Sequence, residues 1–557
     1  MTLASTAQTE TPGAPADRST DPAVVPADDG SGEPSGEPGT EDRPAQRPGT
    51  LAAVLRRRLA TVDTRLDPWS WVATGVIVAI AAILRLVGLD TPKGKIFDEI
   101  YYATDAHNLL TRGVEWNEEN NNAAYVVHPP LGKWLIALGE QIFGYNELGW
   151  RFGAAMAGTI SVLLIIRIAR RMFHSTVLGC AAGLLLALDG FHLVLSRTAL
   201  LDIFLLLFVL AAFGALVLDR DSRRRRWLRA LESGLDPSEQ GRSGRLPFRF
   251  PGAVPWWRLA TGVLLGCAVG VKWSAAFLIP AFLLLGLLWE VGARRSAGVR
   301  RPWLATLRGE TGWFLLGGVL ILLAYIATWS GWLLTDVGYY RHFRADQGLS
   351  EPPVIGALQN LFEYHKAALS FHTGLDTEHT YQSWPWQWLL LARPVAFYWS
   401  TEGACGAASC AAEVLLLGTP ILWWSFLPAL VALVWLGLAR RDWWAGAILL
   451  MVVAGLGPWF YFAADARTMF SFYTAPAVPF LVLAMTYVLG AILGPPRSSP
   501  ARGSGQTSDR RLVGAVIVGA YLMLVAICFA YFYPVFVGQL MDYADWSARM
   551  WLGSRWI

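Results

Sequence analysis

The chain has 557 residues, of which 54% are hydrophobic and only 16% are charged, and its formal net charge is +4. A soluble domain usually carries about 25% charged residues, so this composition excludes an ordinary water-soluble enzyme. Five cysteines are too few for a disulfide scaffold, and 27 tryptophans with 26 phenylalanines are too many for a disordered chain. A polytopic membrane protein remains.

The first 50 residues are rich in Pro, Gly, Ser, Thr, Asp and Glu and contain almost no large apolar side chains. Such a segment cannot bury enough surface to offset its ordering entropy, so we expect residues 1–50 to be a disordered cytoplasmic tail. The segment also lacks the basic and apolar regions of a cleaved signal peptide. We expect residues 51–540 to form one membrane domain and residues 541–557 a short extracytoplasmic tail.

Apolar runs long enough to cross about 30 Å of hydrocarbon recur along the chain. They predict an all-α fold with about eleven spans, at residues 71–89, 148–168, 176–194, 199–218, 259–275, 276–292, 313–333, 413–438, 443–463, 470–493 and 512–533. Arginines concentrate in alternate connections, most densely between Arg220 and Arg258. The positive-inside rule then places the N-terminus in the cytoplasm and the C-terminus outside. The longest outer connections, 90–147 and 334–412, are where we expect function to lie.

Two adjacent carboxylates, Asp98 and Glu99, follow the first predicted span closely and lie among aromatic residues. Partial burial raises a carboxylate's pKa and a nearby lysine lowers it, so such a pair can be tuned for base chemistry. A solvated pair at the membrane interface would explain the same pattern equally well. Further on, the prolines after His128 enforce an extended chain, which would direct His128 and Lys133 towards one place.

Four cationic side chains lie near the outer ends of predicted spans: Arg85, Arg151, Arg197 and Lys272. Asp202 accompanies Arg197 at the same level. An arginine in hydrocarbon costs at least about 2.5 kcal/mol, so it needs an anion or a path to the interface. Together the four cations suggest a site for a lipid-borne phosphate, while snorkelling to the interface is the alternative for Arg85.

Several of these residues occur in motifs that follow the same order in a known family. The motifs are Phe97-Asp98-Glu99, His128-Pro-Pro-Leu-Gly-Lys133, Gly149-Trp-Arg151-Phe, Arg197 to Asp202, Val271-Lys272-Trp273 and Tyr381-Gln-Ser-Trp-Pro-Trp-Gln-Trp388. From about residue 70 to 540 the chain resembles the protein O-mannosyltransferases. The preference for Arg over Lys, with abundant Ala and Gly, favours the actinobacterial type.

This resemblance implies a GT-C glycosyltransferase that moves mannose from polyprenyl-phosphate-mannose to Ser or Thr hydroxyls of exported proteins, with inversion. Asp98 follows the first predicted span closely and matches the first acidic position of the family motif, so we expect it to be the base and Glu99 to orient the acceptor or the cations. The reverse assignment of the two carboxylates stays open from the sequence. The donor phosphate would be held by Arg85, Arg151 and Lys272, with Arg197 as a fourth candidate. The donor and acceptor loops would include His128, Lys133, Asp202, His365 and Trp384. The family needs no metal or other cofactor, and it implies work in the plasma membrane beside the secretion translocon.

The second long outer connection reads as amphipathic helix and loop, with Trp384, Trp386 and Trp388 as an interfacial belt. Eukaryotic members of the family carry a β-trefoil MIR domain here, whereas this chain has only about 80 residues, so we expect that function to be absent or replaced. Histidines in this loop lack a matching carboxylate or thiol set, so no metal site is expected. Cys405 and Cys410 lie outside, where a local disulfide is favoured.

Two other functions remain open from the sequence. A related GT-C enzyme that delivers its sugar to a lipid or glycan would share the carrier site but not the acceptor groove; the 128–133 motif favours a protein acceptor. A transporter or flippase of lipid-linked sugar would carry ionisable groups near mid-membrane and inverted repeats. The charges here cluster at the outer ends of the spans instead.

Overall fold

The computed structural model describes residues 59, 61, 67–237, 254–494 and 506–557. The tail expected at residues 1–50 lies outside the described residues. Within them, nine helical segments are long and apolar enough to cross a membrane. They are α2 (Pro68–Leu86), α5 (Glu147–Phe173), α8 (Asp202–Glu232), η2 with α10 (Trp273–Ser296), α11 (Pro302–Thr328), α16 (Pro420–Arg440), α17 (Trp443–Ala464), η3 with α18 (Ser471–Leu493) and most of α19 (Gln506–Val537).

Two further apolar elements lie at the predicted positions 176–194 and 259–275, but neither is a single helix long and apolar enough to be counted with the nine. Helices α6 (Thr176–Ala187) and α7 (Gly190–Ser196) form a pair that is bent by 65°. Helix α9 (Trp256–Val271) is shorter than the others and leads directly into η2 (Trp273–Leu278) and α10 (Ile279–Ser296). The two splits in the predicted spans, near residues 193–200 and 272–277, are therefore real breaks in the helical chain.

Polar caps mark where several helices begin. The Asp67 carboxylate accepts a hydrogen bond from the Ser70 amide at 3.2 Å, directly before Pro68 starts α2. Asn146, Ser175 and Asp442 cap α5, α6 and α17 in the same way. A cap satisfies an N–H group that has no partner within its helix, so these boundaries are set by local sequence.

The long helices differ in how far they are enclosed by the rest of the protein. In α8 and in η3 with α18, 72% and 78% of the most apolar stretch is buried, whereas in α11 only 6% is buried. An apolar helix that is enclosed all round belongs to the core, and one that exposes its apolar surface suits contact with lipid. Helices α8 and α18 therefore form the centre of the membrane domain.

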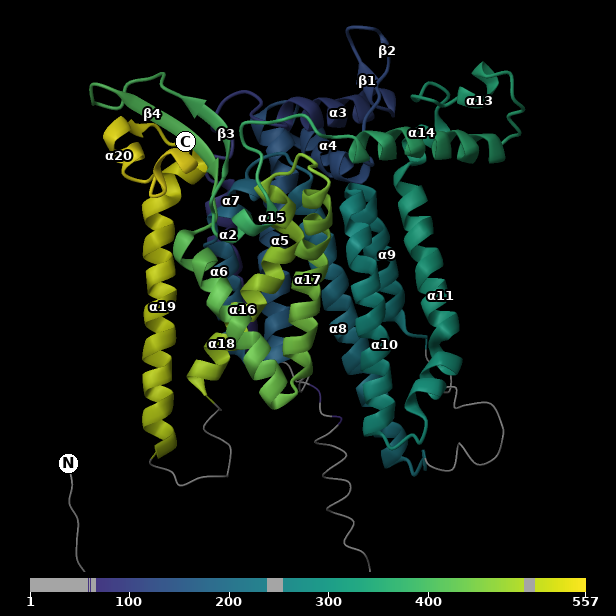
Figure 1. The fold of residues 1–557 in the computed structure, drawn as a ribbon, viewed down its shortest axis with the longest axis vertical. Coiled ribbons are helices and arrows are strands. Elements are labelled where there is room, and N and C mark those ends of the chain that lie inside the picture. Colours follow the sequence, from purple (N-terminus) through teal and green to yellow (C-terminus); the bar gives the residue numbers. More distant parts are fainter. Residues whose placement is uncertain (1–58, 60, 62–66, 238–253, 495–505) are drawn as a thin grey trace, which may run out of the picture. The chain divides into compact units, whose positions relative to one another are not determined.

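Both of the long predicted outer connections form helices and short strands, and they lie at one end of the long helices (Figure 1). The first contains α3 (Glu99–Arg112), the short strands β1 (Trp116–Asn117) and β2 (Asn122–Ala123), and α4 (Leu131–Phe143). The second contains α13 (Phe343–Asp346), α14 (Ile355–Thr373), α15 (Pro385–Trp388) and β3 (Val395–Ser400), after the short α12 (Ser330–Leu334).

A small antiparallel sheet, which the all-α prediction did not include, lies at the same end (Figure 1). Strand β3 pairs with β4 (Cys410–Leu416), and β4 pairs with β5 (Met541–Asp542). Strand β4 is buried along its whole length. Its apolar run overlaps the start of the span predicted at 413–438, but the helix in this region begins only at Pro420. A continuous apolar run does not distinguish a buried strand from a helix.

The sheet brings the last residues of the chain into the fold. Residues after α19 supply β5, α20 (Tyr543–Ser547) and η4 (Gly553–Arg555). The buried Trp546 donates its indole N–H to Glu413 of β4 at 2.6 Å. A disulfide joins Cys405, in the connection between β3 and β4, to Cys410, the first residue of β4.

Candidate active site

A cavity of about 320 Å³ lies where the outer-end elements meet the long helices. This volume is in the range of small-molecule binding sites, about 300–1,000 Å³. Its lining comes from the chain before α4, the first residue of α8, the break between α9 and η2, the end of α14 and the chain before η3. The polar and aromatic lining residues include His128, Asp202, Lys272, Trp273, His372, Arg467 and Tyr473.

Lys272 reaches the cavity because the helical chain breaks at this residue. Helix α9 ends at Val271, and Lys272 is extended, with φ −147° and ψ 138°. Its Nζ donates a hydrogen bond to Asp202 Oδ2 at 2.7 Å, and both side chains are buried. Nζ also lies 5.5 Å from the centre of the Phe472 ring. The ammonium is thus held by one carboxylate and an aromatic face at the cavity wall.

Asp98 precedes α3 and is electrostatically coupled to this pair. Burial raises the pKa of Asp98 to about 6, Lys272 lowers it and Asp202 raises it. The Asp98 carboxylate makes no cap to α3. A carboxylate with a pKa near neutrality is ionised for much of the time at pH 7 and still accepts a proton readily, as a general base requires.

Phe97 holds Asp98 in position through an uncommon backbone conformation. Its φ is +48°, in the left-handed region that non-glycine residues rarely adopt. The Phe97 ring stacks on Phe397 of β3 at 4.4 Å and meets Phe472 edge-on at 6.0 Å. Strained residues of this kind persist only where surrounding contacts enforce them. The β3 strand therefore helps to place the neighbouring carboxylate.

Arg467 lines the cavity and was missed by the sequence analysis. Its Nε donates to the His372 carbonyl at 2.8 Å, and Nη1 donates to the Thr468 carbonyl at 3.3 Å. Among the described residues no carboxylate pairs with it. Arg467 lies just before the predicted span at 470–493. This position at the end of a span, like that of Lys272, is the sequence feature that could have identified it.

Two histidines form another part of the wall, with ring centres 5.2 Å apart. Burial and nearby Lys272 hold the pKa of His128 well below its usual value, and burial also lowers the pKa of His372. His372 Nε2 lies 2.9 Å from the Val127 carbonyl, to which it donates. Both rings are therefore neutral at pH 7 and can offer hydrogen bonds without adding charge.

His365 lies behind the wall and supports Trp273. Its Nδ1 donates to the Leu361 carbonyl at 2.6 Å, which leaves Nε2 to accept from the Tyr325 hydroxyl. That hydroxyl accepts the Trp273 indole N–H at 2.9 Å, and the His365 ring stacks on Trp273 at 5.3 Å. His365 thus acts through Trp273, which does line the cavity.

The four predicted phosphate-binding cations do not share the cavity, because three of them are bonded to other groups of the protein. Arg151 pairs with both Glu99 oxygens at 2.8 Å, and its other N–H groups donate to the carbonyls of Leu89, Pro92 and Gly94. Glu99 also accepts from the amides of Ile96 and Ala199. Arg151 and Glu99 are fully buried, and neither lines the cavity.

Arg197 and Arg85 are also engaged elsewhere. Arg197 donates to four carbonyls at the end of α2, those of Leu84, Arg85, Val87 and Gly88, and so caps that helix. Arg85 is fully buried and bonds to His192 Nδ1 at 2.8 Å and to the Ala81 carbonyl at 3.1 Å. Only Lys272 of the four predicted cations lines the cavity.

Lys133 and Trp384 likewise lie outside the cavity lining. Lys133 is buried between α3 and α4, where it bonds to Glu115 and, at 3.4 Å, to Asp105. Lys133 does not join His128 in the cavity lining, although its charge is near enough to help lower the pKa of His128. Trp384 stacks on Trp386 at 5.7 Å and packs in an aromatic cluster with Trp388 and Trp459.

Comparison with known proteins decides the family. The chain is 40% identical over 499 residues to a polyprenol-phosphate-mannose–protein mannosyltransferase of Mycobacterium tuberculosis, covering 87% of this chain and 91% of the relative. This chain belongs to that family. A Corynebacterium glutamicum member is 34% identical over 513 residues, covering 88% and 94% of the two chains. The resemblance predicted from the motifs is thereby confirmed.

Two family models also match this protein mannosyltransferase family member. Residues 127–233 match the model for dolichyl-phosphate-mannose-protein mannosyltransferase, and residues 357–556 match the C-terminal four TMM region of protein-O-mannosyltransferase. The Saccharomyces cerevisiae protein O-mannosyltransferase Pmt1–Pmt2 complex bound to the sugar donor has a TM-score of 0.65 at 15% identity, covering 90% of this chain and 94% of that chain. The fold predicted for the membrane domain, that of a GT-C glycosyltransferase, is confirmed.

Proposed function

We propose that this protein transfers mannose from polyprenyl-phosphate-mannose to Ser or Thr hydroxyls of exported proteins, with inversion at the anomeric carbon. The names of its relatives, which specify polyprenol-phosphate-mannose and a protein acceptor, support this donor and acceptor class. The observation that carries the proposal is the Asp98 carboxyl, with its pKa of about 6, beside a cavity lined by Lys272 and Arg467.

Asp98 is the proposed general base. A Ser or Thr hydroxyl is too weakly acidic to ionise at neutral pH, so a carboxylate must take its proton as the new bond forms. The acceptor oxygen bonds to the anomeric carbon while the bond from that carbon to the phosphate oxygen breaks. The electron pair of the broken bond leaves with the phosphate, and the proton goes to Asp98.

Lys272 and Arg467 are the proposed ligands of the donor phosphate. Charge-assisted hydrogen bonds to phosphate are about twice as strong as neutral ones. The phosphate gains charge as it leaves, so cations already in place stabilise the transition state more than the bound donor. Asp202 balances the charge of Lys272, and Arg467 supplies the positive charge that favours an anion in the cavity.

The reaction takes place, in this proposal, on the extracytoplasmic face of the plasma membrane, with the N-terminus in the cytoplasm. The alternation of arginine-rich connections supports this orientation. Acceptors emerging from the secretion translocon would meet the cavity before they fold. A reporter that is active only after export, fused after Ile557, should be active.

The test is an assay of the purified protein in lipid with polyprenyl-phosphate-mannose and a Thr-rich peptide. We expect α-linked mannose on the peptide, and Asp98→Asn to reduce transfer by about 10²–10⁴-fold while donor binding persists. Asp90→Asn, which removes an exposed carboxylate that pairs with Lys93, is the matched control. Transfer to an added lipid or glycan but not to the peptide would overturn the protein-acceptor proposal.

A further inference from the structure

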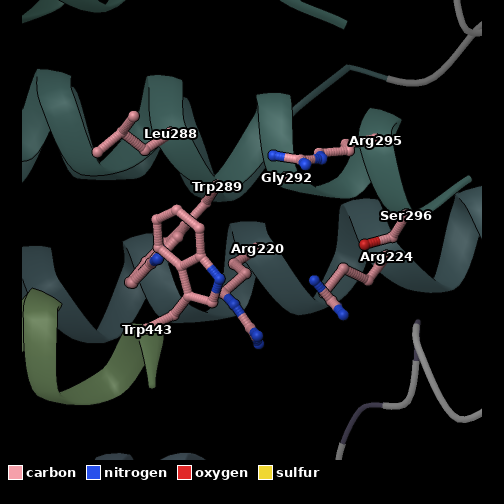
Figure 2. Close-up of a pocket in the computed structure, with 8 residues that line it drawn as sticks. All are labelled: Arg220, Arg224, Leu288, Trp289, Gly292, Arg295, Ser296 and Trp443. Carbon is pink, nitrogen blue, oxygen red and sulfur yellow. The ribbon is translucent and has the colours of Figure 1, made fainter. Parts of the chain in front are cut away.

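A second cavity lies at the other end of α8 from the candidate active site. Figure 2 shows the residues that line it. It measures about 560 Å³ and opens between the C-terminal half of α8, the C-terminal half of α10 and the first turn of α17. Helix α8 begins with Asp202 in the active-site cavity, and Arg220 of the same helix lines the second cavity. At 1.5 Å per residue the two lie about 27 Å apart, close to the thickness of the hydrocarbon layer.

The lining of this second cavity is cationic. Arg220 and Arg224 project from successive turns of α8, and Arg295 comes from α10 (Figure 2). None of the eight lining residues that the structure describes is acidic. Among the described residues the Arg295 side chain takes part in no hydrogen bond or ion pair, and it is exposed.

The carboxylates near this cavity already have hydrogen-bond or ion-pair partners within the protein. Asp221 pairs with Arg171 at 3.0 Å and with Arg220 at 3.1 Å. Asp442 accepts the Tyr487 hydroxyl at 2.8 Å and the Trp444 amide at 2.9 Å. Glu290, Glu310 and Asp219 belong to a buried network with Arg223, Arg258 and Arg294. The positive charge that faces the cavity is therefore only partly balanced by the protein.

The remaining walls are aromatic and apolar. Trp289 is buried, and Trp443 is 58% exposed at the start of α17. The Arg220 guanidinium lies 4.3 Å from the Trp444 ring centre and 5.8 Å from that of Trp289, so both rings hold it in place. Leu288 and Gly292 of α10 complete an apolar side. Tryptophan at the end of a membrane span is typical of the headgroup region.

We propose that this cavity binds the phosphate of an anionic membrane lipid, at the membrane face opposite the active site. The arginines would bond to the phosphate oxygens, and arginine is suited to such bidentate contacts. The exposed Trp443 and Leu288 would contact the glycerol and the start of an acyl chain. A soluble phosphate would use the same arginines but would gain nothing from these apolar walls.

The test measures how much lipid stays bound to the purified full-length protein, by native mass spectrometry. Phosphatidylglycerol is compared with phosphatidylcholine, with and without millimolar inorganic phosphate. We expect phosphatidylglycerol to be retained preferentially and inorganic phosphate not to displace it. Arg295→Gln should weaken retention about fivefold, and Arg224→Gln with Arg295→Gln should weaken it further.

The matched control removes two positive charges at the same end of the helices but outside the cavity. Arg300→Gln with Arg308→Gln does this, since both side chains are exposed. If this control loses as much bound lipid as Arg295→Gln does, retention depends on the overall positive charge at this end, and the proposed lipid site is wrong. Displacement by inorganic phosphate, or equal retention of phosphatidylcholine, would overturn the lipid as its ligand. Because the Arg295 side chain has no partner among the described residues, its single variant remains informative if the double variant does not fold.

Discussion

Arg151 of α5 binds both carboxylate oxygens of Glu99, each at 2.8 Å, where neither side chain is reached by solvent. The adjacent Asp98 has no such partner and lies beside Lys272 and Asp202. Two neighbouring carboxylates are thus separated by their surroundings into a structural anchor and a chemically available group. Because Glu99 also accepts the Ala199 amide at 2.9 Å, the anchor ties α3 to the chain just before α8.

The first prediction concerns this anchor. Arg151→Ala leaves the Glu99 carboxylate buried without its counter-charge, which typically costs about 3–5 kcal/mol. We expect a large loss of thermal stability and a low yield of folded protein, with the donor affinity of the folded fraction little changed. Arg112→Ala breaks an exposed pair with Glu118 and should cost at most about 1 kcal/mol. A stable Arg151→Ala protein that loses only donor binding would return Arg151 to the phosphate site.

The second prediction concerns pH. In the proposed mechanism the ionised form of Asp98 is the base, and burial raises its pKa to about 6, so turnover should fall as the pH drops through about 6 and level off above it. This fall in turnover is the acid limb of the pH profile. Lys272 lowers the pKa of Asp98, so Lys272→Gln should move the acid limb to higher pH. The measurement is the pH dependence of transfer at saturating donor. A limb that stays at the same pH in both Lys272→Gln and Asp98→Asn belongs to another group.

The third prediction concerns Arg467. Replacing it with Gln removes a charge-assisted contact to the donor phosphate, of a kind that contributes about 1.5–3 kcal/mol. We expect kcat/KM for the donor to fall about 10- to 100-fold with little change in stability. Lys366→Gln removes an exposed positive charge at the same end of the helices and serves as the control. Unchanged donor kinetics in Arg467→Gln would remove Arg467 from the site.

The fourth prediction concerns the support of Trp273. Tyr325→Phe removes the hydroxyl that joins Trp273 to His365, a link that contributes about 1 kcal/mol. We expect the KM for donor or acceptor to rise about fivefold while the pH limb of Asp98 stays in place. Tyr461→Phe, at an exposed tyrosine, should have no effect. A shifted pH limb in Tyr325→Phe would mean that Trp273 acts on the base rather than on binding.

Composition and spacing predicted the membrane class and the regions in which the apolar helices lie. The count of eleven spans is not confirmed, because the described residues hold nine such helices, or ten if the bent pair of α6 and α7 is one span. The membrane class and the helix regions depend on local properties, because each apolar run must satisfy the bilayer by itself. Several helices, among them α2 and α5, are also capped by the residue at their own start. The same local reasoning went wrong at β4, whose buried apolar run resembles the start of a span. Sequence motifs also identified Asp98, His128, Asp202 and Lys272, which the structure brings to one cavity or beside it.

Only the tertiary structure decided which charge meets which. Arg151 and Lys272 look alike in the sequence, as cations at the ends of predicted spans, yet one is saturated by Glu99 and three carbonyls and the other lines the cavity. Arg467 joins Lys272 there although the two are far apart in the chain. Hydrophobic spans can be recognised one at a time because burial free energy follows the composition of each segment. The partner of a charged side chain depends on where distant segments place their carboxylates and carbonyls, and that is known only once the helices are packed.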